Sequence, residues 1–161
     1  MTLLASAPDW LAALLLLLLL LAALEDLWHL EINDWVCAAI AGGAFLAVAI
    51  NGPAGELWQN LLLFALILGL GTLLFVRGWM GGGDVKLLAA CSLWFNLDLG
   101  WKMLVAVAIA GGLETLVVML LRALPWPSSL RKRVAVLRPG EGIPYGLAIG
   151  VGVTLIGLAN R

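Results

Sequence analysis

Apolar residues fill six stretches of the chain, and polar residues gather in the short segments between them. The stretches cover residues 8–26, 35–50, 57–76, 85–99, 101–121 and 143–160. A helix that crosses the hydrocarbon core of a bilayer needs about 20 mostly apolar residues. The pattern therefore predicts an all-α polytopic membrane protein, a bundle of about six transmembrane helices in a single domain over residues 1–161. The second and fourth stretches are short, so either their flanks enter the membrane or the bilayer is thinner there.

Composition supports a fold embedded in lipid. Hydrophobic residues make up 63% of the chain and charged residues 12%, which is more apolar surface than a soluble domain can bury. No nucleic-acid partner is indicated, because the basic residues are not spread over a polar surface. The apolar run from Trp10 to Leu24 within the first stretch lacks the basic segment that opens a secretory signal, since Asp9 is the only charge before it. We interpret this stretch as a retained helix, with a cleaved signal as the alternative.

The sequence offers little for metal or disulfide chemistry. Cys37 and Cys91 lie within apolar stretches without a CxxC pair, and His29 is the single histidine. Buried free thiols are the expected state of such cysteines. We therefore expect neither a metal site nor an organic cofactor.

Lysine and arginine are distributed unevenly between the two ends of the predicted bundle. If successive helices alternate in direction, one end carries Arg77, Lys86, Arg122, Arg131, Lys132, Arg133 and Arg138, and the other carries Lys102 and Arg161. Because cytoplasmic loops are enriched in these residues, the first end is predicted to face the cytoplasm of a bacterial inner membrane, with both termini outside. The long loop over residues 122–142 is interpreted as an orientation-setting segment beside anionic headgroups. A docking segment for an acidic or lipid-bound partner is the alternative.

Two aspartates stand at the membrane boundary on the predicted cytoplasmic side. Asp26 ends the first helix and Asp84 begins the fourth. Two carboxyl groups that meet in a partly dry pocket do not both ionise easily, so one keeps its proton and the pair titrates as a unit. An aspartic peptidase needs this state: the ionised member takes a proton from the attacking water, and the protonated member polarises the scissile carbonyl. The alternative is that each acid is solvated at a helix end, as in the acidic segment of Glu25, Glu31 and Asp34.

Three glycines, Gly81, Gly82 and Gly83, come directly before Asp84. Glycine adopts backbone angles closed to other residues and permits close approach of another chain. A carboxylate in the first turn of a helix is also stabilised by the free N–H groups there. Glycine-rich turns before a capping aspartate are common. At the start of a short apolar helix that faces Asp26, however, this string predicts a functional site.

Three motifs together resemble those of the type IV prepilin leader peptidases. The segment Gly-Trp-Met-Gly-Gly-Gly-Asp-Val-Lys-Leu, residues 78–87, resembles the GxGD motif of that family. Asp26 followed by Ile32 is similar to the family's first motif, in which Ile-Pro-Asn comes after the aspartate. The segment Ile-Pro-Tyr-Gly-Leu-Ala, residues 143–148, is similar to the stretch that opens the family's last helix. The resemblance extends over essentially the whole chain.

The resemblance implies an aspartic endopeptidase that needs no cofactor. Its catalytic pair is Asp26 and Asp84, supported by Gly81, Gly82, Gly83, Lys86, Ile143, Pro144, Tyr145 and Gly146. The implied substrate is a prepilin, a hydrophobic helix with a short basic leader, which is cut at the cytoplasmic face. The short chain is similar to tight-adherence (Flp) pilus peptidases. Larger relatives carry a segment with paired CxxC motifs and methylate the new N-terminus; no such segment is present, so we expect no methyltransferase activity. The sequence does not predict an oligomeric state.

Several residues keep two interpretations. Asp34 rivals Asp26, because Ile32-Asn33-Asp34 stands where the family often has Ile-Pro-Asn. Glu114 lies deep in the fifth helix, and we prefer a neutral carboxyl hydrogen-bonded to a neighbouring helix over a role in tuning the pair or contacting substrate. Lys86 is expected to extend to the surface rather than to pair with a carboxylate. Tyr145 either anchors at the interface or lines a substrate groove.

Other functions are consistent with the same sequence. A GxGD peptidase for different membrane substrates would carry the same motifs. A small transporter or proton-conducting subunit would use Asp26, Asp84 and Glu114 as relay acids along a path across the membrane. The placement of two of these acids on one face argues against a relay. A scaffold that has lost activity is a further alternative, supported only by the altered Ile-Asn-Asp stretch.

Overall fold

The computed structural model describes residues 3–52, 57–138 and 141–161, and the regular elements in this part of the chain are all helical. They are α1 (Leu3–Ser6), α2 (Asp9–His29), α3 (Asp34–Asn51), α4 (Leu57–Val76), α5 (Gly82–Ser92), α6 (Leu97–Ala123), α7 (Ser128–Arg133), the 3-10 helix η1 (Ala135–Leu137) and α8 (Gly146–Ala159). The predicted all-α class is confirmed. The six apolar stretches correspond to α2, α3, α4, α5, α6 and α8.

The six bundle helices differ in length more than the sequence predicted. Helices α2, α3, α4 and α6 are long and apolar enough to cross a membrane. Helix α5 has 11 residues and α8 has 14, which at 1.5 Å per residue is about 16 and 21 Å against a core of about 30 Å. The fourth stretch is therefore short, as expected, whereas the second forms an 18-residue helix. The last helix begins at Gly146 rather than Ile143, because the residue before Pro144 is disfavoured in helical conformation.

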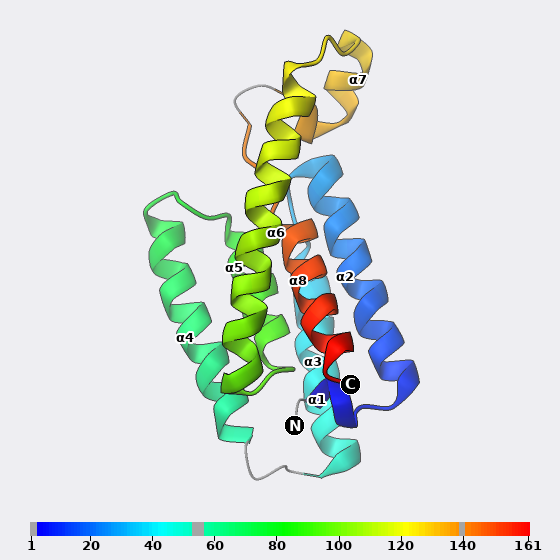
Figure 1. Ribbon diagram of the computed structural model, residues 1–161, viewed down its shortest axis with the longest axis vertical. Coiled ribbons are helices and arrows are strands. Elements are labelled where there is room, and N and C mark those ends of the chain that lie inside the picture. The colour runs from blue at the N-terminus through cyan, green and yellow to red at the C-terminus, as the bar shows by residue number, and fades with distance from the viewer. Residues whose placement is uncertain (1–2, 53–56, 139–140) are drawn as a thin grey trace.

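The helices alternate in direction and leave the basic loops at one end. The loops after α2, α4 and α6 lie at the end of the bundle that carries α7, and both α1 and the C-terminus lie at the other end (Figure 1). Arg77, Arg122 and Arg131 belong to the first end, which we call the basic end, and Lys102 and Arg161 belong to the second. The predicted separation of basic residues between the two ends is thus present in the fold.

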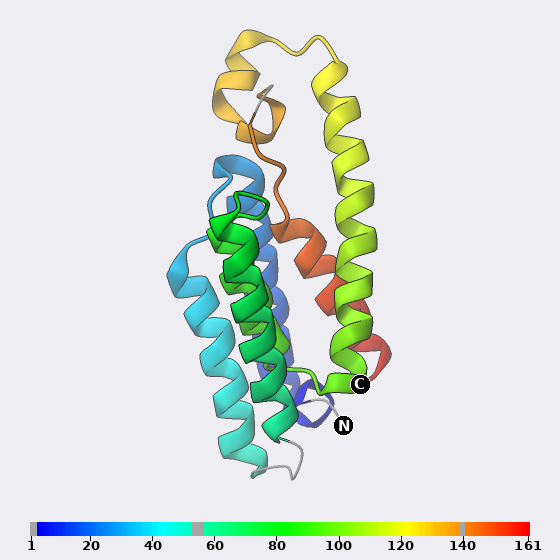
Figure 2. The same cartoon turned by 90° about the vertical axis from the view of Figure 1, so that its left-hand side faces the viewer.

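Helix α8 lies between α2 and α6 and packs on both (Figure 1). On the other side of the bundle, α5 packs on α3 and α4, and α6 stands apart from α3 and α4 at the basic end (Figure 2). The contact of α6 with α8 is close: a Cβ at Gly152 would lie 2.7 Å from the backbone nitrogen of Val107. This close packing against α6 fixes the lateral position of α8 in the bundle, and with it the position of the N-terminus of α8.

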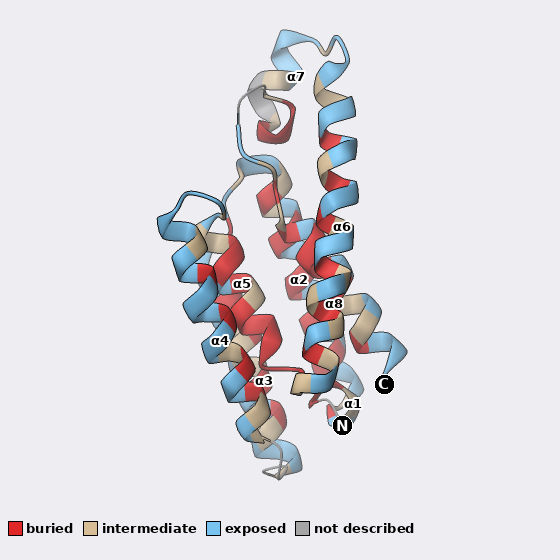
Figure 3. Cartoon of the chain, turned by 60° about the vertical axis from the view of Figure 1, so that its left-hand side comes forward, coloured by how far each residue is buried: buried red, intermediate tan, exposed pale blue. Residues whose placement is uncertain are grey.

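The interior is narrow, and apolar side chains also cover the outside. Trp94 and Phe95 are fully buried where α5 ends, and the Trp94 Nε1–H donates to the carbonyl of Ile40 at 3.1 Å. On the outer faces, Leu70 is 61% exposed and Leu120 is 70% exposed, and much of α4 and α6 is exposed in the same way (Figure 3). Apolar patches of this extent mark surfaces that lie against lipid or a partner. Together with the four long apolar helices, they identify a membrane protein.

Candidate active site

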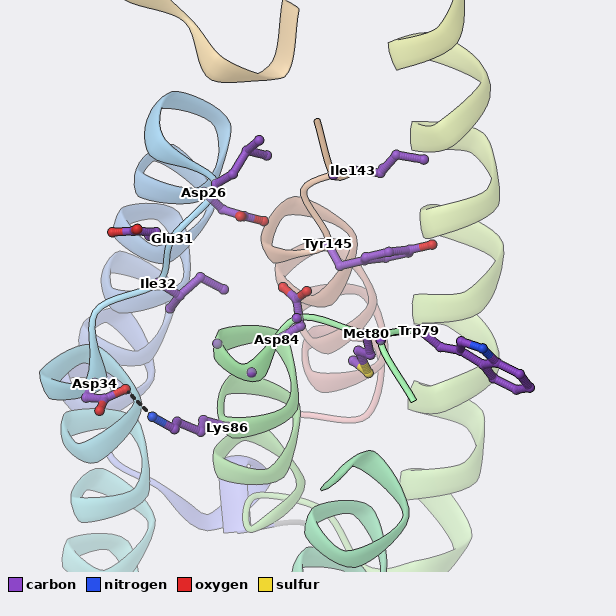
Figure 4. A pocket seen from close by; sticks show the side chains of 16 residues that line it. Asp26, Glu31, Ile32, Asp34, Trp79, Met80, Asp84, Lys86, Ile143 and Tyr145 are labelled. Carbon is purple, nitrogen blue, oxygen red and sulfur yellow. Dashed lines mark hydrogen bonds and ion pairs between the residues drawn. The ribbon is translucent and has the colours of Figure 1, made fainter. Parts of the chain in front are cut away.

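A cavity of about 600 Å³ opens at the basic end of the bundle. Four segments surround it: the end of α2, the segment that leads into the start of α3, the turn before α5 with the first residues of α5, and the segment before α8 (Figure 4). Its lining residues are Asp26, Leu30, Glu31, Ile32, Asp34, Gly78, Trp79, Met80, Gly81, Gly82, Gly83, Asp84, Lys86, Gly142, Ile143 and Tyr145. We call it the dyad cavity, after the two buried aspartates in its wall.

Asp26 sits one turn before the end of α2 and is 3% exposed. Its Oδ2 accepts a 2.6 Å hydrogen bond from the backbone N–H of Gly146, the first residue of α8. Such a bond to a helix N-terminus stabilises and orients a carboxylate. The contact needs glycine, because a Cβ at position 146 would lie 2.9 Å from both Cβ and Oδ2 of Asp26. Gly146 therefore supports Asp26 through its lack of a side chain.

Asp84 is in the first turn of α5 and is 7% exposed. The preceding glycines bring the chain close to its neighbours: a Cβ at Gly81 would lie 2.7 Å from Asp84 Oδ2, and one at Gly83 would lie 3.1 Å from Ile32 Cβ. The carboxyl groups of Asp26 and Asp84 enter the cavity from opposite walls (Figure 4). The two acids thus line one cavity, and the glycine turn lets the chain that carries Asp84 lie close to Ile32.

Asp34, the rival of Asp26, has a different environment. Its Oδ1 lies 2.7 Å from Lys86 Nζ, and the two side chains are 74% and 51% exposed. The preferred expectation for Lys86, extension to the surface without a partner, was therefore wrong: Lys86 forms an ion pair at the rim of the cavity. The altered stretch before Asp34 is held by Glu25, which accepts from the Asn33 side chain at 2.9 Å and from its backbone N–H at 3.3 Å.

Glu114 lies in α6 outside the lining of the dyad cavity and is 9% exposed. Its Oε2 accepts a 3.1 Å hydrogen bond from the backbone N–H of Ala148, so the predicted bond to a neighbouring helix is confirmed. The first turn of α8 is consequently capped by two carboxyl groups from two other helices. Sequence reasoning missed this arrangement. The available signal was that residues 144 and 145 offer α8 none of the usual capping side chains.

The segment before α8 contributes two of its predicted residues directly to the cavity. Ile143 and Tyr145 line it, and Pro144 does not. The Tyr145 ring also packs on α6, where a Cβ at Gly111 would lie 3.0 Å from its Cε1. Tyr145 therefore lies in the wall of the cavity, and its assignment to a substrate groove stays a prediction. Trp79 and Met80 line the cavity as well; they belong to the motif segment 78–87 but were not predicted as site residues.

The two cysteines take no part in this site. Cys37 and Cys91 are both buried free thiols, as expected, and neither lines the dyad cavity. The described residues bring together no group of three or more His, Cys, Asp or Glu side chains that could hold a metal ion. The cavity therefore places two buried carboxyl groups, which can act as an acid and a base, beside a volume large enough to admit water.

Comparison with known proteins identifies the family. No curated protein and no solved structure shows a significant match. The sequence model of the type IV leader peptidase family matches residues 13–122, which is more than half of the chain. The match contains Asp26 and the glycine turn with Asp84, and it ends before the segment 143–148 that also resembles the family. The chain therefore belongs to the type IV leader peptidase family.

Proposed function

We propose that this protein is an aspartic endopeptidase that removes the leader peptide from a type IV, Flp-like prepilin at the cytoplasmic face of the inner membrane. The observation that carries the proposal is that Asp26 and Asp84 are both buried and both line the wall of one cavity. Membership of the leader peptidase family agrees with it. The cavity lies at the basic end of the bundle, which supports a cytoplasmic site under the positive-inside rule.

The proposed mechanism uses the aspartates as an acid and base pair. Two carboxyl groups that share a partly dry cavity hold one proton between them. The ionised member accepts a proton from a water molecule while that water attacks the scissile carbonyl, and the protonated member donates to the carbonyl oxygen. The tetrahedral intermediate then collapses as a proton passes to the leaving amine. The N–H of Gly146 keeps the Asp26 carboxyl in place throughout.

The rim of the cavity supports a substrate with a basic leader. Glu31 and Asp34 line the cavity. Asp34 is already paired with Lys86 at the rim, so the acidic character of the rim rests on Glu31, which is exposed. Acidic groups at the mouth of a site attract a cationic segment and fix its orientation. The scissile segment must be extended there, because a helix keeps its peptide carbonyls in internal hydrogen bonds. Cleavage therefore requires local unwinding between the leader and the apolar helix.

Cleavage of a prepilin encoded near this gene tests the proposal. The precursor is co-expressed with the wild-type chain or with Asp26→Asn, Asp84→Asn or Asp34→Asn, and loss of the leader is followed by mass. We expect the wild type and Asp34→Asn to cleave and the other two to be inactive. The mass of the mature product also shows whether its N-terminus is methylated, and we expect a free amine. Activity in Asp26→Asn with loss in Asp34→Asn would contradict the dyad, and an uncut precursor in every case would contradict the substrate.

A further inference from the structure

A second hollow lies on the outer surface of the bundle, between α6 and α8. It has a volume of about 410 Å³ and is lined almost wholly by apolar side chains. It forms because α2 and α6 continue past the start of the short helix α8 (Figure 1), and Val136 of η1 also lines it. Leu113 and Val117 on α6 are 60% and 53% exposed along it, and Val151 on α8 is 45% exposed. We call this hollow the α6–α8 groove.

One polar side chain, Glu114, lines the α6–α8 groove. Its Oε2 accepts from Ala148, whereas its Oε1 is buried and has no hydrogen-bond partner among the described residues. A buried carboxyl oxygen without a donor is costly in an apolar environment. As a carboxylate oxygen or as a hydroxyl oxygen, Oε1 can accept a hydrogen bond from whatever fills the groove.

The α6–α8 groove adjoins the dyad cavity across a single helical turn. Gly146 donates to Asp26 and Ala148 donates to Glu114, and two helical residues correspond to a rise of about 3 Å. Leu27, which follows Asp26 in the chain, also lines the groove. A chain bound in the dyad cavity could thus continue into the groove within a few residues.

We propose that the α6–α8 groove seats the apolar helix of the substrate, with the start of that helix at Glu114. The proposal rests on the proposed peptidase function and adds where the substrate lies. The first four N–H groups of any helix have no partner within it, and lipid supplies no acceptor for them. In a leader peptidase substrate these donors lie just after the scissile bond, beside the free oxygen of Glu114. A lipid acyl chain fits the apolar wall but brings no donor.

Site-specific photo-crosslinking tests the location. A benzophenone amino acid replaces Leu113, Leu116 or Met80 in the Asp84→Asn chain, which keeps a bound precursor uncut. Leu113 and Leu116 are matched, because both are on α6 and are 60% and 59% exposed, but only Leu113 lines the groove. Met80 lines the dyad cavity and reports binding of the leader region. The same precursor is tested in parallel for cleavage by the wild-type chain.

The expected result is crosslinking of the precursor from positions 80 and 113 and little from position 116. Crosslinking from position 80 with only lipid adducts at 113, or equal labelling from 113 and 116, would overturn the groove proposal and leave the peptidase function standing. If the wild-type chain cleaves no precursor and position 80 labels none, the proposed function itself fails. The two failures are therefore distinguishable.

Glu114→Gln tests the acceptor. The amide oxygen still accepts from Ala148, while an NH2 group, a donor, replaces the second oxygen in the groove. We expect KM to rise roughly tenfold, which corresponds to loss of one buried hydrogen bond, with little change in kcat. Thermal unfolding should stay close to that of the wild type, because the cap on α8 is kept. An unchanged KM would overturn the assignment of Glu114 to the substrate.

Discussion

Adding one methyl group at Gly146 tests how Asp26 is held. A Cβ there would lie 2.9 Å from Asp26 Cβ and Oδ2 and 3.3 Å from the carbonyl oxygen of Ala22. Ordinary contacts begin near 3.4 Å, so either the Asp26 carboxyl group or the backbone of α8 must move by about 0.5 Å. This shift also disturbs the 2.6 Å bond from the Gly146 N–H. Because a displacement on the order of 1 Å can cost about 100-fold in rate, we expect Gly146→Ala to lower kcat by roughly 10- to 100-fold.

The matched control is Gly150→Ala, one turn further along α8. A Cβ at Gly150 would lie 3.8 Å from the carbonyl oxygen of Leu19 and 3.9 Å from its Cβ, which is ordinary contact with the same neighbouring helix. Both substitutions add one methyl group to the same helix, and only the one at position 146 contacts Asp26. Initial rates of precursor cleavage in proteoliposomes, with thermal unfolding of each variant, give the comparison. Equal rates for Gly146→Ala and wild type would refute the claim that close contact with Gly146 positions Asp26.

Three further variants test other contacts. Arg122→Lys loses most of the bonds that Arg122 donates to the carbonyls of Val136, Glu141 and Gly142, so limited proteolysis in that segment should become faster and cleavage of the precursor several-fold slower. Trp94→Phe removes a buried bond to a backbone carbonyl of α3 and should lower the free energy of unfolding by about 1 kcal/mol, measured by denaturant titration in detergent. Lys86→Met breaks an ion pair whose side chains are more than half exposed, and an unchanged melting temperature is expected; a clear decrease would contradict this.

The sequence was sufficient to predict which helix ends lie at the same end of the bundle. Each apolar stretch is long enough to define a helix, and alternation in direction then places the end of α2 and the start of α5 at the same end of the bundle. This arrangement alone predicts that Asp26 and Asp84 lie at the same end of the bundle. The glycines before Asp84 predicted a close approach, and the short contacts at Gly81 and Gly83 show it.

Two kinds of feature could not be predicted: the depth in the membrane at which a helix begins, and the side-chain contacts between helices that are distant in the sequence. Hydropathy does not tell that α8 begins at Gly146, because the apolar residues before it continue into the wall of the cavity. The pairing of Lys86 with Asp34 joins residues 52 positions apart, and spacing along the chain carries no information about it. The capping of Ala148 by Glu114 likewise depends on how α6 and α8 pack, although a buried glutamate in an apolar helix did indicate that a donor had to be near.

The positions of the buried polar groups also bear on whether the protein is a hydrolase or a proton-conducting subunit. In the described part of the chain these groups are Asp26, Asn60, Asp84, Ser92 and Glu114. Asp26 and Glu114 both bind the first turn of α8, and Asp84 shares the dyad cavity with Asp26, so the three acids lie at one level. The amide and the hydroxyl donate to backbone carbonyls, which leaves the other half of the bundle without a buried carboxyl among the described residues. A proton path needs titratable groups along its length, whereas hydrolysis needs an acid and a base at the single depth where water meets the substrate. The clustering of the acids therefore favours a peptidase over a relay.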